Sequence, residues 1–69
     1  MVQERLKARR RELGLSQEEM AKAVGLSMKA YCTYELGQRS PKVDTALKIA
    51  KKLHRSVEFL FGEETKYKS

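Results

Sequence analysis

Residues 16–37 read SQEEMAKAVGLSMKAYCTYELG, and this stretch carries the start and stop signals of two short helices. Ser16, with a glutamate three residues later, has the spacing of a capping box, in which each side chain satisfies a backbone N–H at a helix start. Gly25 directly follows the first helix and permits a left-handed turn that a Cβ would oppose. Ser27 is suited to cap a second helix over residues 28 to about 36.

The two predicted helices have distinct faces. The first helix carries an apolar stripe of Met20, Ala21 and Val24. One face of the second helix carries Tyr31, Tyr34 and Glu35. Its opposite face carries Met28, Lys29, Cys32, Thr33 and Leu36. Two short helices joined by a glycine turn, the second with a polar outer face, indicate a helix-turn-helix.

Four segments extend this pattern along the chain: LGLSQEEMAKAVGLS (13–27), YELGQRSP (34–41), ALKIAKKL (46–53) and SVEFLFG (56–62). Together they resemble the Cro and phage-repressor helix-turn-helix family, also called the Xre family, over roughly residues 3 to 62. The resemblance implies an all-α, five-helix, lambda-repressor-like DNA-binding domain over residues 1–62. The implied function is sequence-specific binding of double-stranded DNA by a transcriptional regulator, with repression the favoured outcome. We expect the polar tail, residues 63–69, to fray.

Charge and composition agree with a nucleic-acid partner but indicate less on their own. The chain has 69 residues, with 15 Lys and Arg against 9 Asp and Glu, a net charge of +6. Such an excess favours nucleic acid or an anionic membrane surface, although many small domains are basic for solubility. A single cysteine fits a reducing compartment. With no long apolar stretch and no apolar signal core in MVQERLKARRRE, we expect a cytoplasmic protein that does not enter the membrane.

Three further helices are predicted outside the central stretch. The first covers residue 3 to about 13. Its one side carries Leu6, Arg10 and Leu13, and its other side carries Arg5, Lys7, Arg9 and Arg11. Alone, the basic side is an ordinary solvated surface, but beside a helix-turn-helix it is a candidate phosphate-facing one.

A core-covering helix is predicted to follow, with Pro41 in its first turn. Its apolar residues at helical spacing are Val43, Ala46, Leu47, Ala50 and Leu53, and its outward lysines are Lys48, Lys51 and Lys52. His54 and Arg55 replace the glycine cap and the small apolar residue usual in the family. This predicts a tighter or locally strained connection, with the Arg55 stem over the core and its charge in water. Ser56 then caps a last helix, VEFLF, closed by Gly62.

Phosphate contacts are expected around the second and third helices. Free N–H groups at helix starts, near Gln17 and Ser27, favour an anion such as phosphate. The resemblance implies that Gln17, Gln38 and Arg39 contact the DNA backbone, which fixes position without reading sequence. It also implies a structural ion pair between Arg10 and Glu35, with a secondary phosphate role for Arg10.

Base contacts are expected from the second helix of the motif, lying in the major groove. The positions that match the family's base readers are Met28, Lys29, Cys32 and Thr33. Lys29 can donate to guanine O6 and N7, and Met28 and Thr33 can touch a thymine methyl. Each has an alternative interpretation as a merely exposed residue, which fits Cys32 best.

Catalysis is poorly supported, and no cofactor or metal is expected. Cys32 and His54 are the only nucleophile-and-base combination, without a third orienting group. One cysteine and one histidine cannot supply a zinc site. There is no glycine-rich phosphate loop. Oxidation of Cys32 as a switch is conceivable, although a lone cysteine is more often inert.

Two questions about protein partners stay open. The competing function is an antitoxin-like or adaptor module, because Leu36 stands where the family usually has a polar residue. The larger, more polar Tyr31 must also bring its hydroxyl to water or a partner.

A homodimer on a palindromic operator is expected, because Val57, Leu60 and Phe61 suit the core and leave Phe59 exposed. In the family's small repressors that position meets the two-fold partner.

Overall fold

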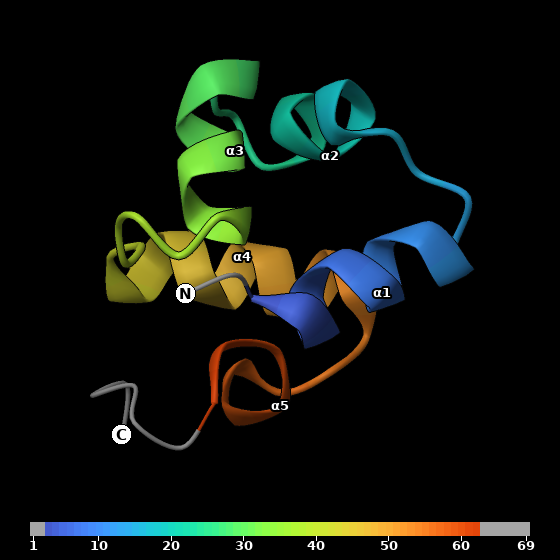
Figure 1. Cartoon of the computed structure of the whole chain (residues 1–69), viewed down its shortest axis with the longest axis vertical. Helices are drawn as coiled ribbons and strands as arrows, with labels where there is room; N and C mark the ends of the chain where they lie inside the picture. The colour runs from blue at the N-terminus through green and yellow to red at the C-terminus, as the bar shows by residue number, and fades with distance from the viewer. Residues whose placement is uncertain (1–2, 63–69) are drawn as a thin grey trace.

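The computed structural model describes residues 3–62, which form five α-helices and no strand (Figure 1). The helices are α1 (Glu4–Glu12), α2 (Gln17–Ala23), α3 (Met28–Glu35), α4 (Val43–Leu53) and α5 (Val57–Phe61). The expected all-α, five-helix architecture is confirmed, and α2 and α3 form the helix-turn-helix. The predicted polar tail, residues 63–69, lies outside the described residues.

The local signals that were predicted to start and end the helices are present. Ser16 Oγ accepts from the Glu19 N–H at 3.0 Å, and Glu19 Oε1 accepts from the Ser16 N–H at 2.8 Å, which completes the capping box. Ser27 and Ser56 cap α3 and α5 by accepting from the N–H three residues on, at 3.1 and 3.0 Å. Gly25 turns the chain between α2 and α3 with a φ of +74°.

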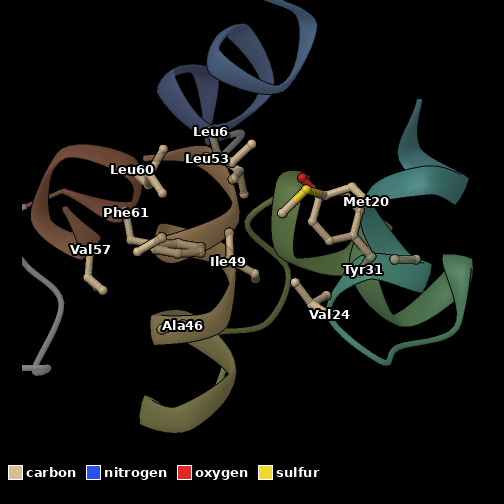
Figure 2. Packing of buried hydrophobic residues seen from close by; sticks show 12 residues of the cluster. Leu6, Met20, Val24, Tyr31, Ala46, Ile49, Leu53, Val57, Leu60 and Phe61 are labelled. Atoms are coloured by element: carbon tan, nitrogen blue, oxygen red, sulfur yellow. The ribbon is translucent and has the colours of Figure 1, made fainter. Parts of the chain in front are cut away.

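One hydrophobic core joins all five helices. Its buried residues are Leu6, Met20, Ala21, Val24, Tyr31, Ala46, Ile49, Ala50, Leu53, Val57, Leu60 and Phe61. Figure 2 shows the α4 side chains between those of α5 and those of the helix-turn-helix. Burying each large apolar side chain contributes about 1.5–3 kcal/mol. Since α4 contacts both sides of the core, it supports the position of α2 and α3 relative to the rest of the fold.

The predicted burial is wrong at three positions. Leu13, Val43 and Leu47 are all exposed, the last by 55%. Leu13 lies beyond the end of α1 as its C-cap. On α4, Leu47 points about 100° away from Ala46, and the core contacts the stripe centred on Ala46 and Ile49. Ile49, absent from the predicted set, is fully buried.

The connections on either side of α4 give one correction and one confirmation. Pro41 does not lie in the first turn, because Lys42 is the extended N-cap and Pro41 precedes it with its ring buried. His54 ends α4 in the left-handed conformation, with φ +56° and ψ +43°. This agrees with the prediction of a strained connection at this position. Arg55 is exposed and its Nη1 donates to the His54 carbonyl at 2.8 Å.

Candidate nucleic-acid interface

The outer face of α3 is a continuous surface formed by the four predicted base-reading residues. Met28 is 52% exposed, Lys29 is exposed beside it, and Cys32 and Thr33 are half-buried one turn further on. The structure therefore brings all four together on one side of the helix. Lys29 provides the only charged side chain among them. The expected outward and inward faces of α3 are confirmed.

Thr33 makes a hydrogen bond that limits what it can offer a ligand. Its hydroxyl donates to the Ala30 carbonyl, one turn earlier in α3, at 2.6 Å. Threonine in a helix commonly bonds back to the preceding turn in this way. The hydroxyl hydrogen is thus committed within the helix, and the methyl group is the part of the side chain without a polar partner.

Behind this face lies the predicted ion pair between Arg10 of α1 and Glu35 of α3. Arg10 Nε donates to Glu35 Oε2 at 2.5 Å and Nη2 donates to Oε1 at 3.2 Å. Arg10 Nη1 donates to the Leu15 carbonyl at 2.7 Å. The two residues are only 6% and 2% exposed. The pair therefore ties α1 to α3. All three nitrogens of the Arg10 guanidinium already donate hydrogen bonds within the protein, and its secondary phosphate contact stays a prediction.

The charged state of the pair follows from these contacts. Burial would raise the pKa of Glu35, but its hydrogen bonds, led by the one from Arg10, hold that pKa below the ordinary value. The hydrogen bond to Glu35 raises the pKa of Arg10, against the opposing effect of burial. Both groups are consequently ionised at neutral pH.

Tyr31 corrects an expectation about the α2–α3 packing. The side chain is fully buried beside Met20 (Figure 2), and its hydroxyl has no hydrogen-bond partner among residues 3–62. The expectation that this hydroxyl reaches water or a partner is therefore not met among the described residues, because the core closes over the whole ring. Burial, and secondarily the Glu35 carboxylate, raise the pKa of Tyr31 far above its ordinary value. The phenol stays neutral.

The ion pair also extends to the predicted phosphate contact at the start of α2. Gln17 is half-buried, and its Nε2 donates to Glu35 Oε1 at 3.2 Å. Sequence reasoning missed this bond, because 18 positions separate the two residues and no local spacing signals it. Glu35 thus restrains the Gln17 amide as well as the Arg10 guanidinium.

The other predicted phosphate contacts flank α3 at its two ends. Ser27 is exposed, and its Oγ is the N-cap of α3. Gln38 and Arg39 are exposed in the turn after α3, and their N–H groups donate to the Thr33 carbonyl at 3.0 and 3.4 Å. These two bonds hold the turn against the last part of α3, on which Thr33 lies.

Two arginines on the basic side of α1, Arg5 and Arg9, make contacts within the protein. Arg9 Nε donates to the Leu53 carbonyl at 2.9 Å, and Arg9 Nη1 pairs with Glu12 at 3.0 Å. The Arg5 guanidinium lies 5.4 Å from the centre of the Phe59 ring. The Arg5 and Arg9 guanidiniums thus contact the α4–α5 part of the fold, and a phosphate-facing role for the basic side of α1 stays a prediction.

A second surface feature is a shallow groove at the end of α4. It is lined by Leu47, Lys48, Ala50, Lys51, His54, Arg55 and Ser56. It contains the only histidine of the chain, whereas the only cysteine lies on α3. Within residues 3–62, no three potential ligands gather to hold a metal, and no helix has the length and apolarity to cross a bilayer.

Comparison with known proteins agrees with the helix-turn-helix formed by α2 and α3. A family model described as helix-turn-helix matches residues 6–60. The HTH-type regulator YqaE of Bacillus subtilis is 37% identical over 68 residues, 99% of this chain and 59% of that protein. The cryptic phage CTXphi transcriptional repressor RstR of Vibrio cholerae is 34% identical over 61 residues, 88% of this chain and 54% of that protein.

A third relative is matched along nearly its whole length. The HTH-type regulator YqaF of Bacillus subtilis is 38% identical over 72 residues, 100% of this chain and 95% of that protein. By contrast, the chain spans little more than half the length of YqaE and RstR. No solved structure matches this chain.

Proposed function

Because this chain belongs to the helix-turn-helix family, we propose that it is a transcriptional regulator that binds double-stranded DNA with α3 in the major groove. The observation that carries this proposal is the exposed outer face of α3, with Ser27 at its N-terminal end, Arg39 just past its C-terminal end, and Gln17 of α2 bonded to Glu35 near that second end. An α-helix with its side chains, about 10–12 Å across, fits the major groove, about 12 Å wide. Repression is the favoured outcome, in line with the name of the relative RstR.

The proposed contacts divide into anchors and readers. Gln17, Ser27, Gln38 and Arg39 contact phosphates and set the position of α3 on the duplex. Lys29 donates to guanine, and Met28, Cys32 and Thr33 face neighbouring bases. The Arg10–Glu35 pair stands behind them and keeps α1, α3 and the Gln17 amide in register.

The salt dependence of DNA affinity tests the proposal. If binding neutralises several phosphates, the logarithm of the DNA affinity should fall linearly with the logarithm of the salt concentration. The slope should be about −0.9 for each phosphate contacted. Fluorescence anisotropy with a labelled duplex pool, from low to physiological ionic strength, measures this slope. A slope near zero, or no complex even at low salt, contradicts the proposal.

We further propose a homodimer that uses Phe59 and places two copies of α3 on a palindromic site, about 34 Å apart. Phe59 is 40% exposed on α5, and the guanidiniums of Arg5 and Arg55 lie 5.4 and 5.8 Å from its ring centre. A two-fold contact brings these arginines near their own copies. Added salt screens that repulsion, so self-association should strengthen with salt while DNA binding weakens.

Sedimentation equilibrium at low and high salt, without DNA, tests the homodimer. Phe59→Ala should shift the protein towards monomer, whereas Leu13→Ala, at another exposed apolar residue, should not. A parent protein that stays monomeric at high concentration, and binds single half-sites as tightly as palindromes, rules the dimer out.

The alternative, an antitoxin-like or adaptor module, would use the groove at the end of α4. Its supporting observation is the exposed Leu47 among lysines and Arg55. None of the residues that line this groove belongs to α3, and in Figure 1 α3 and α5 lie on opposite sides of α4. An adaptor gives no gel-shift complex with duplex DNA at low salt.

A further inference from the structure

The outer face of α3 offers very few hydrogen-bond donors. Met28 presents a thioether, Cys32 a half-buried thiol, and Leu36, one turn beyond, is apolar and exposed. The Thr33 hydroxyl already donates to the Ala30 carbonyl at 2.6 Å. Lys29 is therefore the one strong donor available to base edges on this face.

The chemistry of the major groove restricts what such a face can recognise. Bidentate hydrogen-bonded readout of adenine or guanine uses asparagine, glutamine, arginine or lysine, and of these α3 has Lys29 alone. A threonine hydroxyl can also bond to a base, but the hydrogen of the Thr33 hydroxyl is already donated to the Ala30 carbonyl. The apolar feature of the groove is the C5-methyl group of thymine. Met28 and the Thr33 methyl are suited to contact this methyl group. Neither of them forms a hydrogen bond with a polar base edge.

We propose that α3 reads C5-methyl groups in the major groove, with Thr33 acting through its methyl and not its hydroxyl. This inference rests on the proposed DNA-binding function and names what the site recognises. Its preferred duplex has thymines opposite Met28 and Thr33 and a guanine opposite Lys29. Because 5-methylcytosine carries the same methyl at the same ring position, it replaces thymine partly, whereas cytosine does not.

The size of the effect follows from the area of one methyl group. Burying a group of this size contributes about 0.8 kcal/mol, which corresponds to roughly a fourfold change in affinity. Replacing one contacted thymine by deoxyuridine removes only that methyl and leaves the hydrogen-bonding groups of the base pair unchanged. Replacing two contacted thymines should therefore weaken binding by roughly tenfold or more.

The experiment uses a duplex selected from a random pool, with thymines replaced one at a time by deoxyuridine. The expected result is a loss of roughly fourfold at positions facing α3 and none at flanking positions. Two protein variants separate the methyl from the hydroxyl of Thr33. Thr33→Val keeps a methyl in a similar shape and should keep the affinity, whereas Thr33→Ser should lose roughly the same factor as deoxyuridine.

Combining the changes tests whether the two methyls touch. Thr33→Ser on the deoxyuridine duplex should lose little beyond either change alone, because one shared contact is removed only once. Circular dichroism checks that each variant is folded. A duplex with deoxycytidine in place of the contacted thymine should bind more weakly. Replacing that deoxycytidine by 5-methyldeoxycytidine should recover part of the lost affinity.

A failure of methyl reading can be distinguished from a failure of the proposed DNA binding. Steep salt dependence with no effect of deoxyuridine, or loss of binding in Thr33→Val but not in Thr33→Ser, overturns methyl reading and leaves DNA binding intact. No binding to any duplex overturns both.

Discussion

Replacing Glu35 with glutamine leaves the Arg10 guanidinium buried beside a neutral amide. The two side chains are only 8% and 3% exposed, so water cannot solvate the charge that loses its partner. Removing one member of a buried pair typically costs about 3–5 kcal/mol. We expect about 3 kcal/mol for Glu35→Gln, because the amide oxygen still accepts one of the two hydrogen bonds that Arg10 donates to this side chain.

That loss is large for a chain of 69 residues, whose free energy of unfolding is roughly 3–10 kcal/mol at typical values per residue. Urea denaturation followed by circular dichroism measures it. The paired change Arg10→Met with Glu35→Leu should be much less destabilising than either single change, because an apolar pair leaves no buried charge. A double-mutant cycle then gives the coupling between the two side chains.

The same paired variant separates folding from binding. It removes the Glu35 oxygen that accepts from Gln17 at 3.2 Å, so the Gln17 amide loses its restraint in a protein that still folds. We expect weaker binding to selected and scrambled duplexes by a similar factor. A Glu35→Gln variant within 0.5 kcal/mol of the parent, which is the range of ordinary surface changes, would refute the interpretation of the pair.

Four further results are expected. Because the pKa of Glu35 is held below its ordinary value of 4.5, its stabilising effect is present above that pH and is lost on acidification, so Glu35→Gln should flatten the fall in urea midpoint towards pH 3. His54→Gly should raise the melting temperature by a few degrees, corresponding to about 1 kcal/mol, because glycine adopts the left-handed cap without strain. Tyr31→Phe removes a buried hydroxyl that has no hydrogen-bond partner among residues 3–62 and should leave the free energy of unfolding unchanged or higher; a loss above about 1 kcal/mol would reveal a hydrogen bond to that oxygen. In anisotropy titrations, Lys29→Ala should cost about 1–3 kcal/mol on the selected duplex and much less on a scrambled one, whereas Gln17→Ala should weaken both equally.

Local chemistry explains which parts of the fold could be predicted from sequence. The caps at Ser16, Ser27 and Ser56 involve residues three positions apart, so their partners are visible in the sequence itself. Gly25 and His54 lie at helix ends where a left-handed residue is needed. These signals fix the starts of α2, α3 and α5 and the ends of α2 and α4 without any knowledge of the packing, whereas α1 and α4 begin without a side-chain cap.

Tertiary packing explains the errors. The sequence of α4 has more apolar residues than one stripe can hold, and contact with the rest of the core buries Ile49 and exposes Leu47. Periodicity alone cannot choose between them. The Gln17–Glu35 hydrogen bond and the buried Tyr31 hydroxyl likewise depend on how α2 and α3 meet. The base-reading and phosphate roles stay predictions, because they require the DNA.

A two-dimensional 15N NMR titration with a selected duplex tests the placement of DNA most directly. At 8.0 kDa, each backbone amide can be followed separately. The largest shifts are expected at Lys29 and Thr33 on α3, with smaller ones at Gln17 and Arg39, and none in the groove around Lys51. Large shifts confined to that groove, with α3 unchanged, would contradict major-groove binding by α3.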